Sequence, residues 1–139
     1  ELREECARVA GVDVEVLLEA IRFEPFPEVE GVLDECARRG IALAVVSNWD
    51  VSLHDVLEGL GWTGRFGAVV TSAELGVAKP DPRPFLVALE ALGVEPADAV
   101  HVGDDADADV RGAAAAGVRG VLLNREGGGA VASLAELLD

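Results

Sequence analysis

The chain alternates short apolar runs with amphipathic helical patterns, and this alternation limits its possible folds more than any other feature. Such runs lack the polar alternation of half-exposed strands and are typical of strands buried on both faces. The helical patterns between them imply right-handed crossovers. The sequence therefore predicts an α/β fold with a mainly parallel sheet and helices on both faces. The four runs are Ile41–Val46, Ala68–Thr71, Ala99–Val102 and Val118–Leu123.

The predicted helices are bounded by residues that favour helix ends. Gly40 and Gly93 follow two of the helical patterns, and glycine is common just beyond a helix C-terminus. Asp50 is a candidate N-cap, and Ser133-x-x-Glu136 is a capping box at the start of the last helix. The predicted helices cover residues 29–37, 50–60, 81–93, 107–117 and 133–138.

Residues 1–24 form a separate region of the sequence. Residues 1–10 and 14–21 carry helical patterns, and the stretch 23–27 contains two prolines and is predicted to be an extended linker. We expect this region to be the end of a helical unit, joined by the linker to an α/β domain of residues 25–139.

The composition excludes several classes of partner. The formal net charge of −15 argues against nucleic acid and anionic lipid, which both require clustered lysine and arginine. No apolar stretch approaches the roughly 20 residues that cross a bilayer, and the charged N-terminus is not a signal peptide. Cys6 and Cys36 lie on helical patterns beside apolar residues, which favours reduced thiols. We therefore expect a cytoplasmic protein that binds neither nucleic acid nor membrane.

Polar residues follow the ends of the predicted strands. Ser47 and Asn48 follow the first strand, Thr71 ends the second with Lys79 downstream of it, and Asp104 follows the third. Ligands of parallel α/β sheets bind beyond the carboxyl ends of the strands. Residues far apart in the sequence are therefore expected to converge on one edge of the sheet.

The densest polar feature is a group of four carboxylates within six residues, Asp104, Asp105, Asp107 and Asp109. Adjacent carboxylates repel each other, and a hard cation such as Mg²⁺ relieves that repulsion. Helix capping explains one or two acids at a helix start but not four. Asp104, at the strand end, is the best candidate for a direct metal ligand. Asp109 lies one turn further on, where it either binds the metal through water or orients Lys79.

A hydroxyl, a lysine and an acidic metal site together suggest phosphate chemistry. Ser47 offers a hydroxyl, together with backbone N–H groups at the N-terminus of the helix that follows. Lys79 adds a positive charge for the same oxygens. Taken singly, Ser47 is also explained as a turn residue and Lys79 as a solvated surface charge. The order of these residues at successive strand ends favours a common site.

Two other side chains are open to two interpretations, and a third has one. Trp49 either lines a substrate pocket or packs in the core. His101 lies within a predicted strand, which favours a buried, hydrogen-bonded histidine over a catalytic one. His54 is expected to be exposed on its helix.

In these motifs the chain resembles the haloacid dehalogenase-like (HAD) hydrolase superfamily, and within it the capped, phosphatase-like branch. The resemblance covers about residues 25–125, and its motifs are specific in combination. The second family motif is matched by Val45-Val46-Ser47-Asn48, the third by Lys79-Pro80-Asp81-Pro82, and the fourth by Val102-Gly103-Asp104-Asp105 with a further acid at Asp109.

The resemblance implies a Rossmann-like core, a bound Mg²⁺ ion and hydrolysis through a transiently phosphorylated aspartate. The dehalogenases of the superfamily use no metal and lack the Gly-Asp-Asp pattern, which disfavours carbon–halogen cleavage. Carried over by position, the implied phosphate-binding residues are Ser47, Asn48 and Lys79, the implied catalytic residue is Lys79, which steadies the phospho-aspartate, and the implied metal ligands are Asp104, Asp105 and Asp109.

One part of the family pattern is absent from the sequence. The first motif, a buried strand that ends in Asp-x-Asp and carries the nucleophile, has no match before Ser47. Val12-Asp13-Val14-Glu15 has the right spacing of acids, but Asp13 is predicted to be a helix N-cap. The family's cap domain lies between its first and second motifs. We therefore expect residues 1–24 to be a cap remnant and residues 25–139 to be a core truncated at its N-terminus, without its nucleophile strand.

The absence of a central strand would leave edges unpaired in the middle of the sheet. Either the missing N-terminal segment associates from elsewhere, or the remaining strands rearrange, or a second copy of the chain supplies the pairing.

The full-length protein is accordingly predicted to be a Mg²⁺-dependent phosphomonoester hydrolase that acts on a small phosphorylated metabolite, with negligible turnover by this chain alone. The alternative is a non-catalytic HAD-fold remnant that binds a ligand or supports assembly. A signalling receiver domain also combines acids, a hydroxyl and a lysine, but in the reverse order along the chain.

Overall fold

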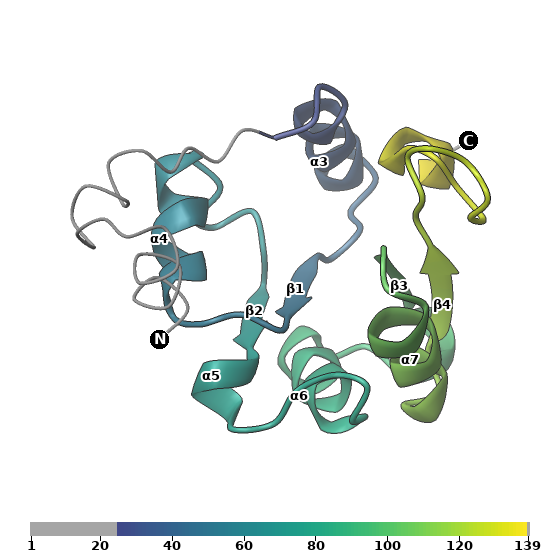
Figure 1. Cartoon of the computed structure of the whole chain (residues 1–139). Helices are drawn as coiled ribbons and strands as arrows, with labels where there is room; N and C mark the ends of the chain where they lie inside the picture. The colour runs from purple at the N-terminus through teal and green to yellow at the C-terminus, as the bar shows by residue number, and fades with distance from the viewer. Residues whose placement is uncertain (1–24, 139) are drawn as a thin grey trace, which may run out of the picture.

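The computed structural model describes residues 25–138, in which helices and strands alternate (Figure 1). The predicted cap remnant of residues 1–24, with Asp13, lies outside the described residues. No helix within the described range is long and apolar enough to cross a bilayer. The elements are α3 (Val29–Arg38), β1 (Ala44–Ser47), α4 (Ser52–Gly59), β2 (Ala68–Thr71), α5 (Ser72–Leu75), α6 (Arg83–Leu92), η1 (Pro96–Asp98), β3 (Val100–Gly103), η2 (Ala106–Arg111), α7 (Gly112–Ala115), β4 (Arg119–Leu122) and η3 (Leu134–Leu138).

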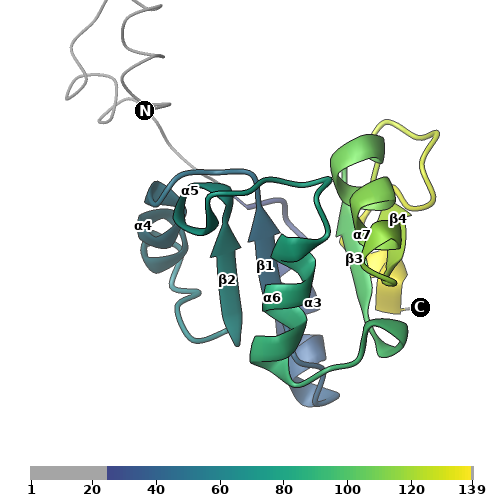
Figure 2. The ribbon, with the colours of Figure 1, turned by 90° about the horizontal axis from the view of Figure 1, so that it is seen from below.

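The four strands form two parallel pairs. In the first pair, β1 runs beside β2 with Ser47 opposite Thr71, and in the second, β3 runs beside β4 with Gly103 opposite Leu122. Figure 2 shows the order β2, β1, β3, β4 across the molecule, and no ladder joins β1 to β3. The predicted parallel pairing is confirmed. The predicted single sheet is instead divided at its centre, which leaves one edge of β1 and one edge of β3 unpaired within residues 25–138.

Helix α6 connects the two strand pairs. In Figure 2 it lies between the β1–β2 pair and the β3–β4 pair. Its Phe85 and Leu89 are buried in one core cluster with Ala113 of α7, and Val46 of β1 packs against the same cluster. The ring of Phe85 is only 3% exposed. Burial of one such side chain stabilises a fold by about 1.5–3 kcal/mol, so α6 contributes strongly to holding the halves together.

A second core cluster covers the opposite face of β1 and β2. Leu33 of α3 and Leu57 of α4 are buried in it, and Val45 of β1 packs against it. Successive side chains of a strand point to opposite faces, so Val45 and Val46 enter different clusters. Helices therefore cover both faces of the β1–β2 pair, as the α/β pattern predicts.

The strands are less buried than their apolar sequences predict. Among the strand residues, only Val70, Thr71 and Val121 are buried, and Val100 at the start of β3 is 56% exposed. The expectation of strands buried on both faces is therefore wrong for most of their length. The physical reason is the division of the sheet, because within residues 25–138 each strand pairs with only one other strand.

The helix boundaries agree with the sequence where a full helical period is present. Helices α3, α4 and α6 lie where they are predicted, and α6 ends at Gly93 in the left-handed conformation. The predicted helix at 107–117 is instead a π-helix, η2, followed by α7, and the last helix is a 3₁₀ segment. The short segments α5 and η1 are too brief to show a period, so the sequence did not predict them.

Candidate active site at the carboxyl ends of the strands

The predicted convergence of residues at the strand ends is borne out by contacts between distant motifs. Ser47 is the last residue of β1, and Asn48 follows it. The Asn48 amide forms two hydrogen bonds with the backbone of Lys79: Nδ2 donates to the Lys79 carbonyl over 3.0 Å, and Oδ1 accepts from the Lys79 N–H over 2.9 Å. Asn48 therefore fixes the loop that carries Lys79 to the end of β1, although 31 residues separate them.

The side chain of Lys79 is directed to Asp109. The two form an ion pair in which the lysine side chain is 9% exposed and the aspartate 7%. The same oxygen of Asp109, Oδ1, lies 2.9 Å from Nε2 of His101, and Oδ2 accepts from the Asp105 N–H over 3.1 Å. The carboxylate thus receives three donors from three parts of the chain.

These donors keep Asp109 ionised. Burial raises the pKa of the Asp109 carboxyl, but hydrogen bonds from His101 and Lys79 outweigh burial and hold that pKa well below its ordinary value. A carboxylate can only accept hydrogen bonds, so Nε2 of His101 carries the proton that lies between the two groups. Of the alternatives that the sequence left open, the structure shows Asp109 facing Lys79 and His101 as a largely buried, hydrogen-bonded histidine.

Because Asp109 is ionised, the free energy of unfolding of the chain is expected to depend on pH in the acid range. Its pKa is lowered by folding, so its contribution is complete above the ordinary carboxyl range, near pH 4, and is lost as the pH falls through the lowered pKa. In Asp109→Asn this contribution is absent. The difference in unfolding free energy between wild type and variant is therefore expected to narrow below about pH 4. Urea unfolding at several pH values measures it, and a difference that stays constant with pH would contradict the prediction.

Glycine at position 103 provides the space that Asp109 occupies. A Cβ atom at Gly103 would lie 2.1 Å from both Cγ and Oδ2 of Asp109, closer than any real contact allows. The backbone of Gly103 does not have positive φ, so space alone requires glycine here. The last residue of β3 is thus a glycine because a carboxylate from η2 lies over it.

The other three acids of the cluster have separate positions. Asp105 is the N-cap of η2, and its Oδ1 accepts from the N–H groups of Asp107 and Ala108 over 2.9 Å each. Asp107 pairs with Arg111 on the surface. Asp104 is exposed just beyond the end of β3, and no ion pair to it forms within residues 25–138.

The acids near the end of β3 fit the Mg²⁺ ion that the motifs imply in one respect. Within the described residues, no group of three histidine, cysteine, aspartate or glutamate side chains is arranged so that it could hold a metal ion by itself. Mg²⁺ keeps several waters and is commonly held by one or two carboxylates together with substrate phosphate. The exposed carboxylate of Asp104 fits that pattern. Asp105 and Asp109 already accept hydrogen bonds, so they fit supporting roles better than direct ligation.

Several neighbours of the strand ends have structural roles. Thr71 caps α5, since its hydroxyl accepts from the Glu74 N–H over 3.2 Å. Trp49 packs against the second core cluster and donates from Nε1 to the Ser52 hydroxyl over 3.1 Å. The packing interpretation of Trp49 is therefore the one the structure supports. Helix α4 begins at Ser52, and its N-cap is Val51 rather than the predicted Asp50. Oδ1 of Asp50 nevertheless accepts from the Ser52 N–H over 2.8 Å.

Comparison with known proteins identifies the family. The model of the haloacid dehalogenase-like hydrolases matches residues 2–117, most of the chain. The chain belongs to this family. The HAD resemblance of the motifs is thereby confirmed, and so is the Rossmann-like α/β class of the fold.

Individual HAD relatives include enzymes of two chemistries. The chain is 47% identical over 105 residues to a phosphoserine phosphatase of Thermus thermophilus, which covers 75% of this chain and 42% of that protein. A HAD phosphatase structure from Thermococcus onnurineus has a TM-score of 0.83 at 31% identity, covering 94% of this chain and 66% of the other. A 2-haloacid dehalogenase structure from Pseudomonas syringae has a TM-score of 0.72 at 34% identity, covering 89% and 52%. The fold alone therefore does not select the reaction.

The chain spans less than half the length of the curated HAD relatives it matches, with 38–44% of the first five covered.

One signal in the sequence marks Lys79 more strongly than its motif does. Lys79 is the only lysine among 11 lysine and arginine residues. An ammonium group is a compact point charge on a flexible stem, whereas a guanidinium is planar and donates in a fixed geometry, so the two are not interchangeable. A single lysine in a chain that otherwise uses arginine therefore indicates that this position requires an ammonium group. The contact of His101 with Asp109 was not predicted, because the sequence of a strand does not indicate which carboxylate lies next to a histidine within it.

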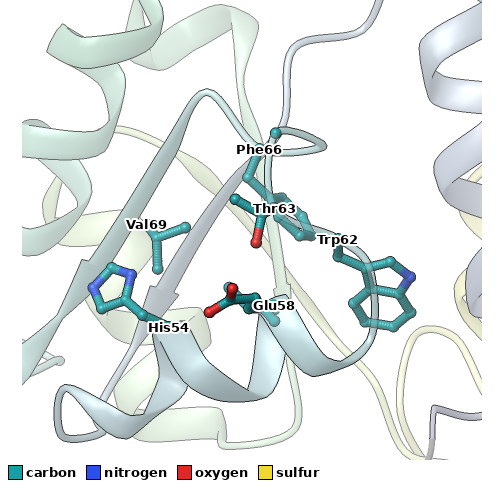
Figure 3. Close-up of a pocket in the computed structure, with 8 residues that line it drawn as sticks. His54, Glu58, Trp62, Thr63, Phe66 and Val69 are labelled. Carbon is teal, nitrogen blue, oxygen red and sulfur yellow. The ribbon is translucent and has the colours of Figure 1, made fainter.

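One hollow among the described residues lies away from these HAD motifs. It has a volume of about 390 Å³ and is open to solvent on the α4 side of β2 (Figure 3). The exposed His54 of α4 lies at it, as expected for that residue, and none of the predicted site residues lines it. Its labelled lining residues are His54, Glu58, Trp62, Thr63, Phe66 and Val69.

Proposed function

We propose that the full-length protein is a Mg²⁺-dependent phosphomonoester hydrolase whose substrate is a small phosphorylated metabolite. The observation that carries this proposal is the buried ammonium group of Lys79, held at the strand ends by the backbone contact with Asn48 and the ion pair with Asp109. A fixed positive charge at the strand ends, where Ser47 also offers a hydroxyl, is suited to binding phosphate oxygens. The phosphatases among the HAD relatives support this choice. Small phosphorylated metabolites are intracellular, so we propose a cytoplasmic location.

Each predicted phosphate-binding residue keeps a role in the proposal. Ser47 supplies its hydroxyl at the end of β1, and Lys79 neutralises charge on the phosphoryl oxygens and on the phosphorylated aspartate. Asn48 uses one N–H of its amide on Lys79, which leaves the second N–H for a phosphate oxygen. Its larger contribution is to fix the position of Lys79.

Asp104 would hold the Mg²⁺ ion, with Asp105 and Asp109 in support. The bound ion would neutralise phosphoryl oxygens in the transition state. Asp105 holds the first turn of η2 and Asp109 holds Lys79, so both fix the surroundings of Asp104 rather than compete with it. Asp104 is also the acid that the dehalogenase chemistry does not need, which is why we favour phosphate release over carbon–halogen cleavage.

The nucleophile is proposed to be an aspartate on a strand that lies between β1 and β3. In the part of the chain that the structure describes, both strands have an unpaired edge, and the two parallel pairs flank this position (Figure 2). An inserted parallel strand would satisfy both edges and carry its last residue to Ser47 and Asp104. This arrangement explains the division of the sheet better than rearrangement or pairing between copies. We expect the residues encoded before Glu1 to include an apolar strand ending in Asp-x-Asp, and this chain alone to be inactive.

The proposal is tested by phosphate release from a panel of small phosphomonoesters, with and without Mg²⁺. The full-length protein is expected to hydrolyse at least one of them, and Lys79→Met is expected to abolish the activity. Failure on every phosphomonoester by a folded full-length protein would favour the alternative, a non-catalytic HAD-fold protein that binds a ligand or supports assembly.

Asp104→Asn is expected to raise the Mg²⁺ concentration for half-maximal activity by at least about tenfold, because it removes the anionic ligand. The matched control is Asp107→Asn, which changes an acid of the same segment that pairs only with exposed Arg111 in the described residues. Titration of activity with Mg²⁺ measures both variants. Equal effects of the two substitutions would remove Asp104 from the proposed metal site.

A further inference from the structure

His101 contacts the charged pair of the proposed site from a position that the HAD motifs do not include. It lies in β3, and its side chain is 16% exposed. Its Nε2 donates to Oδ1 of Asp109 over 2.9 Å, the oxygen that also receives Lys79. Its ring meets Phe85 edge-on, with centroids 4.8 Å apart and planes at 83°. The ring is thus held by packing on one side and a charge-assisted hydrogen bond on another.

The His101 contact determines the orientation of the Asp109 carboxylate. Oδ2 is held by the Asp105 N–H, and Oδ1 is shared by His101 and Lys79. Gly103 has no side chain that could hold the carboxylate in place. Without the imidazole, Oδ1 would be restrained only by Lys79, a flexible side chain with four rotatable bonds. The lysine and the aspartate could then move together away from the strand ends.

We propose that His101 is a positioning residue for the hydrolysis, which holds Asp109 so that Lys79 stays at the carboxyl ends of β1 and β3. The proposal rests on the function proposed above. His101 does not touch substrate; it acts through Asp109 on the ammonium group. Its effect belongs to the chemical step, because a displaced Lys79 would stabilise the transition state less while leaving most substrate contacts in place.

The experiment compares two substitutions of similar size. His101→Leu keeps apolar contact with Phe85 but has no donor, and His101→Gln retains an N–H that can reach Asp109. His54 is the matched control, since it is the other histidine of the chain, exposed on α4 and paired with Glu74. The variants are His54→Leu and His54→Gln. Steady-state kinetics of the full-length protein and the melting temperature are measured for all four.

We expect His101→Leu to lower kcat about tenfold, with a change in KM of less than about threefold. His101→Gln is expected to recover most of kcat, and both His54 variants to match wild type. Equal losses in His101→Leu and His101→Gln that follow a lower melting temperature would show a packing role and overturn the proposal. An unchanged kcat in His101→Leu would also overturn it.

A second measurement separates this inference from the proposed function. Lys79 is the only lysine of the chain, so selective ¹³C,¹⁵N-lysine labelling of the 139-residue chain gives the NMR signals of one lysine residue. The Cε–Hε signal, next to the ammonium group, is followed, and it can be attributed to Lys79 without further assignment. His101→Leu is expected to shift this signal, and His101→Gln to leave it near the wild-type position. If the full-length protein releases no phosphate, the proposed function fails, and this shift still tests the placement of Lys79 by His101. A signal that does not move in His101→Leu would overturn that placement.

Discussion

Replacing Asp109 with leucine is expected to destabilise the chain by about 3–5 kcal/mol, because it leaves a buried ammonium group without its counter-charge. Lys79 is 9% exposed, and Asp109 is the only carboxylate paired with it within residues 25–138. Lys79→Met is expected to cost less, about 1–2 kcal/mol, since the Asp109 carboxylate keeps its donors from His101 and Asp105. The order of the two effects follows from the asymmetry of the contacts around one ion pair. Chemical denaturation, with the slope held constant between variants, measures both.

Two further variants test this explanation. The double variant Lys79→Met with Asp109→Leu removes both charges, and it is expected to be more stable than Asp109→Leu alone because no uncompensated charge remains. Asp107→Asn is the control, and it is expected to change stability by less than about 0.5 kcal/mol, since its pair with Arg111 is exposed. A double variant no more stable than Asp109→Leu would show that volume rather than charge controls the loss.

The sequence predicted which residues would lie at the strand ends, because that depends on local patterns. The apolar runs give β1 to β4 within a few residues, and parallel strands bring their carboxyl ends together. The pairing of Lys79 with Asp109 was one of two alternatives at the level of sequence. The other alternative was that Asp109 binds the metal through water, and the position of Asp109 about one turn after Asp104 is compatible with both.

The sequence could not decide which acid of the cluster turns inward. Asp104, Asp107 and Asp109 are chemically alike, and their spacing does not distinguish an α-helix from the π-helix that forms. The choice depends on long-range contacts: donors from β3 and from the loop of Lys79, and the missing side chain at Gly103. The burial of the strands was mispredicted for a similar reason. An apolar run indicates that a strand is suited to the interior of a sheet, but it does not indicate whether other strands pair with both of its edges.

Gly103→Ala is expected to disrupt the site more than any other single-methyl change in the described residues. The new Cβ would lie 2.1 Å from Cγ and Oδ2 of Asp109, so the carboxylate must move. It cannot do so freely, because three donors hold it. We expect a loss of about 1–3 kcal/mol in unfolding free energy from overpacking. In the full-length protein we expect a loss of phosphatase activity at least as large as that of His101→Leu, since Lys79 moves with Asp109.

The glycines of the chain supply a control for this change. Gly31 lies within α3, and a Cβ there would meet nothing within 4 Å. Gly31→Ala is therefore expected to stabilise the chain by about 0.5–1 kcal/mol through helix propensity. The decisive comparison places Gly103→Ala in an Asp109→Gly background, because glycine at position 109 also removes the Asp109 Cβ, which would lie 2.6 Å from the added methyl. The added methyl should then cost little, because the atoms it would displace are gone, whereas a cost unchanged by the removal of Asp109 would mean that Gly103 is required for the strand itself.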